Sequence, residues 1–117
     1  MIAEDALVTP IDARIRAGLD RVFAVRDAIG ADIALLVDCH WRFDKTRAAT
    51  LMKDLVPASL HWLECPISEH PSHFGAIVRL RHMARDNGMQ LAGGEAITGP
   101  EDAQAMCDAG LYDVLMP

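Results

Sequence analysis

The stretch Ile33-Ala-Leu-Leu-Val37, followed at once by Asp38, indicates how this chain folds. It is an apolar run of strand length that ends in an acid, and three more short apolar runs follow it: Leu60–Leu63, Met89–Ala92 and Tyr112–Met116. None of them alternates strictly between apolar and polar residues, which is typical of parallel strands covered on both faces. We therefore expect the interior strands of a parallel sheet.

Segments with helical periodicity separate these runs. We expect four helices, bounded by capping residues, prolines or glycines: Arg16 to Ile29, with Leu19, Val22 and Ile29 inward; Asp44 to just before Pro57; Ser72 to Gly88; and Thr98 to Gly110, with Ala103, Met106 and Cys107 buried. In the last, either Thr98 is the cap and Glu101 reaches back, or Gly99 caps with Pro100 in the first turn. This alternation predicts an α/β fold of right-handed βαβ units.

The length and composition limit the class of protein. With 117 residues, and with no linker or charge block, the chain is expected to form one domain, in which residues 1–10 are loop. A formal net charge of −6 gives no general attraction for nucleic acid or anionic membranes. No apolar run is long enough to span a bilayer and no signal-peptide pattern is present, so the expected compartment is cytoplasmic. Three cysteines without a CxxC pair are expected to be reduced, half-buried side chains.

An acid follows each of the first three apolar runs: Asp38, Glu64, and Glu95 after Gly93-Gly94. They are each about one strand–helix unit apart, so a parallel sheet places them side by side at its carboxyl edge. One such acid could simply cap a helix or face solvent. Three converging carboxylates repel one another unless a cation neutralises them, and all-oxygen ligands favour Mg²⁺. The pattern therefore predicts a magnesium site.

Three motifs carry a family resemblance: Val37-Asp38-Cys39-His40, Trp62-Leu-Glu-Cys-Pro66 and Ala92-Gly-Gly-Glu95. Together with the flanking segments Arg21–Gly30 and Asp113–Pro117, they resemble the mandelate racemase branch of the enolase superfamily. The pattern alone fits an open doubly wound sheet equally well. The resemblance implies a segment of a (β/α) TIM-type barrel, with about four parallel strands and four helices.

The resemblance also implies a chemistry. Asp38, Glu64 and Glu95 would bind the Mg²⁺ that holds a small substrate carboxylate and stabilises the enediolate formed by proton abstraction. The Asp-x-His pattern that ends in His40 is similar to superfamily members that dehydrate sugar acids, where the histidine acts as general acid. A racemase or cycloisomerase of the same superfamily is the alternative, and His40 could also be a loop histidine bonded to backbone. Arg42 either contacts the substrate or forms a surface ion pair.

Other polar and aromatic residues near these motifs leave further alternatives open. Trp41 and Phe43 either wall the pocket or pack over a helix start. His61 is expected in the middle of a strand, facing a helix. A zinc site of Cys39, His40, His61 and Cys65 is awkward, because strand neighbours point to opposite faces. The segment after the Glu64 strand contains three residues expected to be solvated loop residues: Glu69, His70 and His73.

The resemblance covers only part of a barrel, since a complete one needs about 250 residues. The basic residues expected on the second strand, the seventh-strand histidine and the capping domain lie outside the match. A truncated, non-catalytic metal-binding remnant is therefore a further alternative. A partial barrel leaves unpaired sheet edges, which predicts a homo-oligomer.

Overall fold

In the described part of the first unit, residues 10–33, the main element is one long helix. A computed structural model describes residues 10–117, and the chain divides into a compact unit that ends at Ile33 and a second compact unit, Ala34–Pro117. In the first unit, helix α2 (Pro10–Ile29) begins six residues before the expected start, with its proline in the first turn, where a missing N–H costs nothing. Pro10 is thus helical and not loop, while residues 1–9 lie outside the described part.

Helix α2 ends as the sequence predicts. Gly30 follows it with a φ of 80°, a left-handed conformation that favours glycine. Arg26 Nη1 donates to the carbonyl oxygens of Gly30 (2.8 Å) and Ile33 (2.7 Å), which ties the segment after the helix back to its last turn. None of the residues of α2 is fully buried, so its expected inward face is only partly covered.

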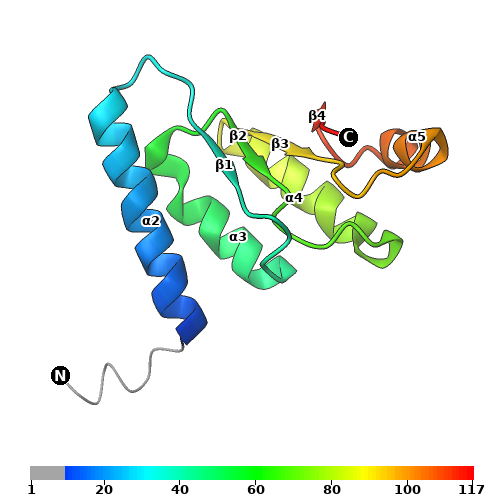
Figure 1. The fold of residues 1–117 in the computed structure, drawn as a ribbon, viewed down its shortest axis with the longest axis horizontal. Helices are drawn as coiled ribbons and strands as arrows, with labels where there is room; N and C mark the ends of the chain where they lie inside the picture. The colour runs from blue at the N-terminus through cyan, green and yellow to red at the C-terminus, as the bar shows by residue number, and fades with distance from the viewer. Residues whose placement is uncertain (1–9) are drawn as a thin grey trace. The chain divides into compact units, whose positions relative to one another are not determined.

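The second unit contains a four-stranded parallel sheet with its strands in chain order (Figure 1). The strands are β1 (Leu36–Asp38), β2 (Trp62–Glu64), β3 (Gln90–Gly93) and β4 (Val114–Leu115). Strands β1, β2 and β4 are shorter than the apolar runs, because the first residues of these runs lead into the strand, while β3 is as long as its run but begins and ends one residue later. The register pairs Asp38 with Glu64 and Glu64 with Ala92, so the predicted parallel sheet is confirmed.

Three α-helices and two short 3₁₀ turns connect the strands: α3 (Lys45–Asp54), η1 (Val56–Ala58), η2 (Pro71–His73), α4 (Phe74–Asp86) and α5 (Pro100–Ala109). Asp44 caps α3 as predicted, and its carboxylate accepts a hydrogen bond from the backbone N–H of Arg47 at 2.7 Å. Helix α5 takes the second of the two predicted starts, with Gly99 as the N-cap. Thr98 donates to Asp102 through both its backbone N–H and its hydroxyl.

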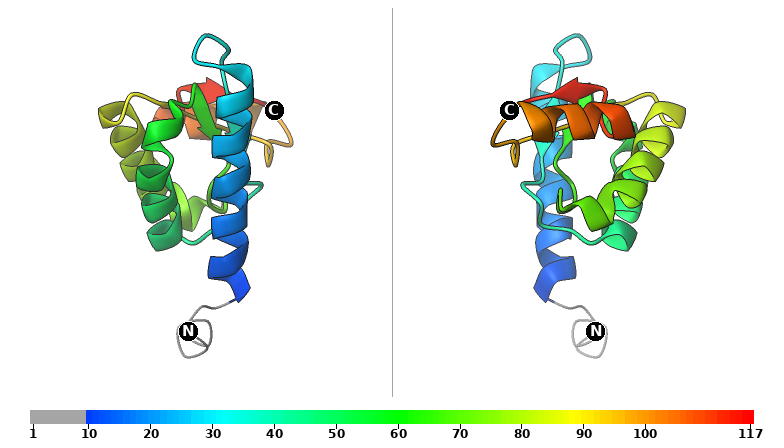
Figure 2. Two further views of the ribbon diagram at one scale, coloured as in Figure 1. Left: turned by 90° about the vertical axis from the view of Figure 1, so that its left-hand side faces the viewer. Right: turned by 90° about the vertical axis from the view of Figure 1, so that its right-hand side faces the viewer.

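The core of the second unit lies between the sheet and helices α3 and α4, which lie side by side in both views of Figure 2. Helix α5 contributes Met106, whereas Cys107 is exposed and not buried as expected. Successive helix residues are turned by about 100°, so only one of these two neighbours can face the core. The largest fully buried side chains come from helices, strands and the loops between them: Met52, Leu55, Leu63, Ile67, Ile77, Leu91 and Leu111.

Two of the three cysteines are more buried than expected. Cys39 and Cys65 follow directly after β1 and β2 and are almost inaccessible. Burial, and then nearby carboxylates, raise the pKa of each thiol to about 12, so both stay neutral thiols. In the described part of the chain, no helix is both apolar enough and long enough to cross a membrane.

Candidate metal centre

The three predicted carboxylates lie along the carboxyl edge of the sheet. Asp38 and Glu64 are the last residues of β1 and β2 and are direct partners in the parallel register. Glu95 lies in the turn just beyond Gly93, which ends β3. The sequence therefore predicted the edge correctly, and the register explains why residues far apart in the chain meet there.

A sharp turn after β1 brings His40 to the same place. His40 and Trp41 both have left-handed φ values (49° and 63°), so the chain folds back instead of continuing as a strand. The backbone N–H of His40 donates to Asp38 Oδ1 at 2.9 Å, and that of Trp41 donates to the carbonyl oxygen of Cys65 at 2.7 Å. His40 thus reaches the site as predicted, but through a turn and not through strand alternation.

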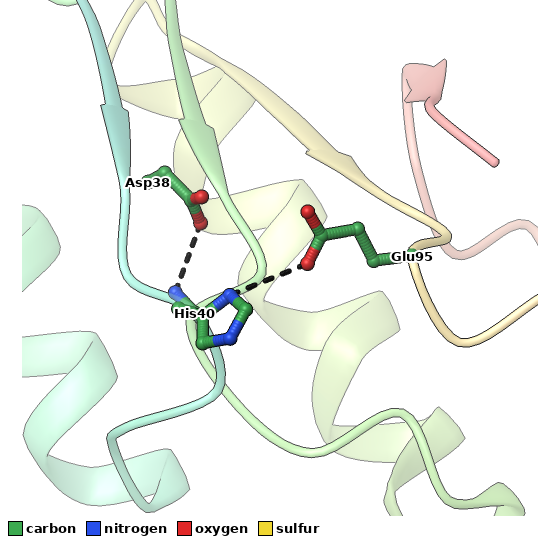
Figure 3. A group of neighbouring side chains, drawn as sticks. All are labelled: Asp38, His40 and Glu95. Carbon is green, nitrogen blue, oxygen red and sulfur yellow. Dashed lines mark hydrogen bonds and ion pairs between the residues drawn. The ribbon is translucent and has the colours of Figure 1, made fainter.

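Asp38, His40 and Glu95 form a compact cluster, in which one ligand atom from each lies within 4.8 Å of the others (Figure 3). His40 Nδ1 is 3.3 Å from Glu95 Oε2. The side chains of His40 and Glu95 are 58% and 37% exposed, so the cluster is open to solvent and to a ligand. Two oxygen donors and one nitrogen donor at this spacing fit a divalent cation.

Glu64 lies outside this cluster but within reach of its charges. Partial burial raises the pKa of Glu64, and the negative charge of Asp38 is the next largest cause. Glu95 and Glu69 raise this pKa further, while the neighbouring Trp62 indole lowers it. The indole Nε1 nevertheless does not meet the geometry of a hydrogen bond to Glu64. The ionised carboxylates therefore repel one another, and a bound cation would relieve that repulsion. The cluster thus contains two of the three predicted carboxylates, Asp38 and Glu95, with His40 as its third member, while Glu64 lies outside it.

The other predicted site residues lie elsewhere or make different contacts. The side chain of Arg42 is exposed, and its backbone N–H donates to the carbonyl oxygen of Cys39. His61 is exposed and precedes β2, so its expected place in mid-strand is wrong. The four residues of the zinc alternative do not form a metal-ligand cluster in the described part of the chain, where the single such cluster contains His40 with two carboxylates.

The sequence-based expectation is most clearly wrong for Glu69, which is buried (6% exposed) and is not a solvated loop residue. Its Oε1 accepts hydrogen bonds from Trp41 Nε1 (3.1 Å) and the Ala96 N–H (3.0 Å). Its Oε2 accepts from the Gly94 N–H (2.6 Å) and the Tyr112 hydroxyl (2.6 Å). All four donors are distant from Glu69 in sequence, so no local sequence pattern predicts that Glu69 accepts these hydrogen bonds. Gly93-Gly94 is the one available signal, since paired glycines often permit close approach of a backbone.

Comparison with known proteins identifies the family. A family model described as "Enolase C-terminal domain-like" matches residues 5–117. The chain belongs to this family. The enolase superfamily membership predicted from the three motifs is therefore confirmed, including its mandelate racemase branch.

Curated relatives of this enolase-family chain act on sugar acids or their lactones, as their names state. The chain is 29% identical to D-gluconate dehydratase of Thermoproteus tenax over 103 aligned residues. The aligned region covers 88% of this chain and 20% of that protein. The chain is 31% identical to D-galactarolactone cycloisomerase of Agrobacterium fabrum over 96 aligned residues. That region covers 82% of this chain and 24% of the relative. The chain thus spans about a fifth to a quarter of the relatives that it matches.

Solved structures confirm the fold. L-talarate dehydratase from Polaromonas sp. JS666, in complex with Mg and L-glucarate, has a TM-score of 0.79 at 24% identity, covering 95% of this chain and 29% of that one. An enolase from the alpha proteobacterium bal199 with bound Mg has a TM-score of 0.70 at 33% identity, covering 80% and 24%. The chain is a segment of a TIM-type barrel, with four parallel strands and four α-helices.

Proposed function

We propose that this chain supplies the metal-binding strands of a Mg²⁺-dependent acid-sugar dehydratase. The observation that carries the proposal is the cluster of Asp38, His40 and Glu95 at the carboxyl edge of a parallel sheet. That edge is where barrel enzymes hold their reacting groups. Relatives named as dehydratases of sugar acids support the substrate class, a small carboxylate with hydroxyl groups.

Asp38, Glu64 and Glu95 would hold the cation in this proposal. Bound Mg²⁺ supplies positive charge next to the substrate carboxylate, where negative charge grows once the neighbouring carbon loses its proton. The chain's own groups prepare for this. Partial burial raises the pKa of Glu64 first and the negative charge of Asp38 raises it next, and a bound cation would favour the ionised carboxylate against both effects.

His40 would act as the general acid that removes the hydroxyl group. Its Nδ1 lies 3.3 Å from Glu95 Oε2, so Nε2 is the ring nitrogen left for proton transfer. The proton on Nε2 passes to the departing hydroxyl, which leaves as water. Arg42 is exposed two residues further along the same turn, and we assign it to contact a substrate carboxylate or hydroxyl.

A cycloisomerase or racemase of the same superfamily is the second candidate. The 31% identity to a D-galactarolactone cycloisomerase favours it, because that relative matches the chain about as well as the dehydratases do. The two candidates share the metal site and differ in the task of His40. Dehydration needs an acid for the leaving hydroxyl, whereas racemisation does not.

Calorimetric titration with Mg²⁺ tests the site. We expect wild type to bind, and Asp38→Asn, Glu64→Gln and Glu95→Gln each to weaken binding by tenfold or more, on the order of 1.4 kcal/mol. Glu101→Gln is the matched control, since Glu101 is an exposed acid in the first turn of α5. Absence of Mg²⁺ binding by wild type would refute the metal site.

A screen of sugar acids then separates the candidates. Release of water from a sugar acid that is lost in His40→Asn supports the dehydratase. Isomerisation without loss of water supports the second candidate. Metal binding without turnover of any substrate favours a non-catalytic remnant.

We also propose that the chain self-associates in the cytoplasm. Within residues 34–117 the sheet begins at β1 and ends at β4, and Leu36 on β1 is 42% exposed. Strand edges and apolar surface of this kind favour pairing with a second copy. Light scattering at micromolar concentration is expected to give a dimer or larger species, and a monodisperse monomer would contradict this.

A further inference from the structure

Glu69 is the one buried charged residue among residues 10–117, and it has no role in the chemistry described above. A buried carboxylate is costly unless several donors satisfy it, and Glu69 has four. Burial, and then the hydrogen bond to Glu69, raise the pKa of Tyr112, so its hydroxyl stays protonated and donates. The carboxylate is therefore held in one place from all sides.

The donors to Glu69 flank the residues of the metal cluster. Gly94 and Ala96, whose N–H groups are bound by Glu69, are the residues on either side of Glu95. Trp41, the third donor, follows His40, and the rings of these two residues stack with centroids 5.1 Å apart. One carboxylate thus fixes the backbone around Glu95 and the indole against which His40 lies.

The local sequence around Gly93 and Gly94 makes this arrangement possible. A Cβ at Gly93 would lie only 2.3 Å from Tyr112 Cζ, so the phenol ring crosses β3 where a side chain is missing. Gly94 has a φ of 109°, a conformation that side chains rarely permit and that turns the chain away from β3 just after the N–H that Glu69 accepts. The paired glycines therefore leave the space and the backbone freedom that Tyr112, Glu69 and the turn of Glu95 need to contact one another.

We propose that Glu69 is a positioning residue that sets the separation of His40 and Glu95 across the candidate metal centre. The predicted effect of Glu69 on metal affinity rests on the proposed function, because it requires that this site binds a metal. The geometric part of the inference does not, because hydrogen bonds within the protein join the turn of His40 and the turn of Glu95 to the Glu69 carboxylate. Groups that orient metal ligands from behind commonly change metal affinity by about 10–100-fold when removed.

Glu69→Gln tests the proposal, because it keeps the size of the side chain but replaces one acceptor oxygen with a donor. The matched control is Asp113→Asn. Asp113 also accepts two hydrogen bonds, from Arg81 Nε (3.1 Å) and the Leu91 N–H (2.8 Å), but it lies at the opposite edge, where β3 and β4 begin. Both variants remove one acceptor oxygen that joins distant segments.

Two readouts are needed. The first is Mg²⁺ affinity by calorimetry, at a temperature at which every variant is folded by circular dichroism. The second is the nuclear Overhauser contact between the His40 ring and the Glu95 side chain in metal-free protein. We expect Glu69→Gln to weaken Mg²⁺ binding by about tenfold or more and to lose the contact, and Asp113→Asn to change neither.

The outcomes separate the two proposals. If wild type shows the His40–Glu95 contact but binds no Mg²⁺, the proposed function fails and the positioning role is judged on the contact alone. If Glu69→Gln keeps both the contact and the affinity, or if Asp113→Asn loses them equally, the positioning role is refuted. Should Glu69→Gln not fold, Trp41→Phe removes one donor only, and the same readouts are expected to change in the same direction by a smaller factor.

Discussion

An exposed cluster with two carboxylates and a single buried carboxylate lie near the same edge of the sheet, and they differ in burial and in hydrogen bonding. The cluster of Asp38, His40 and Glu95 is exposed, and two contacts of 2.9 and 3.3 Å join its members. Glu69 is 6% exposed and accepts four hydrogen bonds from segments next to three other strands. A ligand for a metal must keep lone pairs available, whereas a residue that fixes a backbone must have its lone pairs occupied.

The difference teaches how the two kinds of acid are told apart. The acids at the strand ends lie close enough to repel one another: after partial burial, the negative charge of Asp38 is the next largest cause of the raised pKa of Glu64, and a bound cation would relieve that repulsion. The buried acid already accepts four hydrogen bonds and contributes to the fold itself. Metal affinity and folding stability should therefore respond to different substitutions.

The largest effect on stability is expected from Glu69→Ala. It leaves the N–H groups of Gly94 and Ala96 and the Tyr112 hydroxyl without their acceptor in a largely buried place. Each orphaned donor costs roughly 1–3 kcal/mol, so we expect a loss of at least about 3 kcal/mol in the free energy of unfolding. Urea denaturation measures it. Glu95→Gln is the comparison from the exposed cluster, with an expected change within about 0.5 kcal/mol. Equal losses in the two variants would erase the distinction.

Gly93→Ala is expected to have the next largest effect. The new Cβ would overlap the Tyr112 ring, whose nearest atoms are 2.3–2.7 Å away, so the ring and its bond to Glu69 must shift. Overpacking of this kind costs typically about 1–3 kcal/mol. The control is Gly75→Ala on α4, where the nearest atom, Arg79 Nη1, is 3.7 Å away. There we expect a gain of roughly 0.5–1 kcal/mol, because alanine is the better helix former. Thermal denaturation of both variants gives the answer.

The smallest effect concerns the pH dependence of stability that Glu64 causes. Its pKa is raised in the folded state, so the folded chain binds this proton more tightly than the unfolded chain does. The contribution is favourable below the unfolded-state pKa and is lost as the pH rises through the folded value. We expect Glu64→Gln, without metal, to gain less than about 1 kcal/mol relative to wild type above that range.

Melting curves between pH 4 and pH 7 measure this difference, and Mg²⁺ is expected to reduce it for wild type by neutralising Asp38, Glu64 and Glu95. A difference between Glu64→Gln and wild type that grows toward low pH would show that the sign is wrong.

The sequence predicted the parts of the site that depend on local pattern. Asp38 and Glu64 are strand ends that parallel pairing must place side by side, so apolar runs followed by acids were sufficient. Asp44 as a cap and Gly30 as a helix end also follow from neighbouring residues. The turn that carries His40 was missed, because two left-handed residues at His40 and Trp41 give no signal in the residue types.

The sequence by itself determined the parallel α/β order and the superfamily, because each follows from short runs and motifs that recur in successive strand–helix units. Only the tertiary structure decided which acids stay open and which is buried. In the sequence Glu69 looks like an ordinary loop acid, whereas in the structure it accepts hydrogen bonds from Trp41, Gly94, Ala96 and Tyr112. The physical reason is that burial and hydrogen bonding of a carboxylate depend on donors from other strands, and sequence spacing does not record their positions.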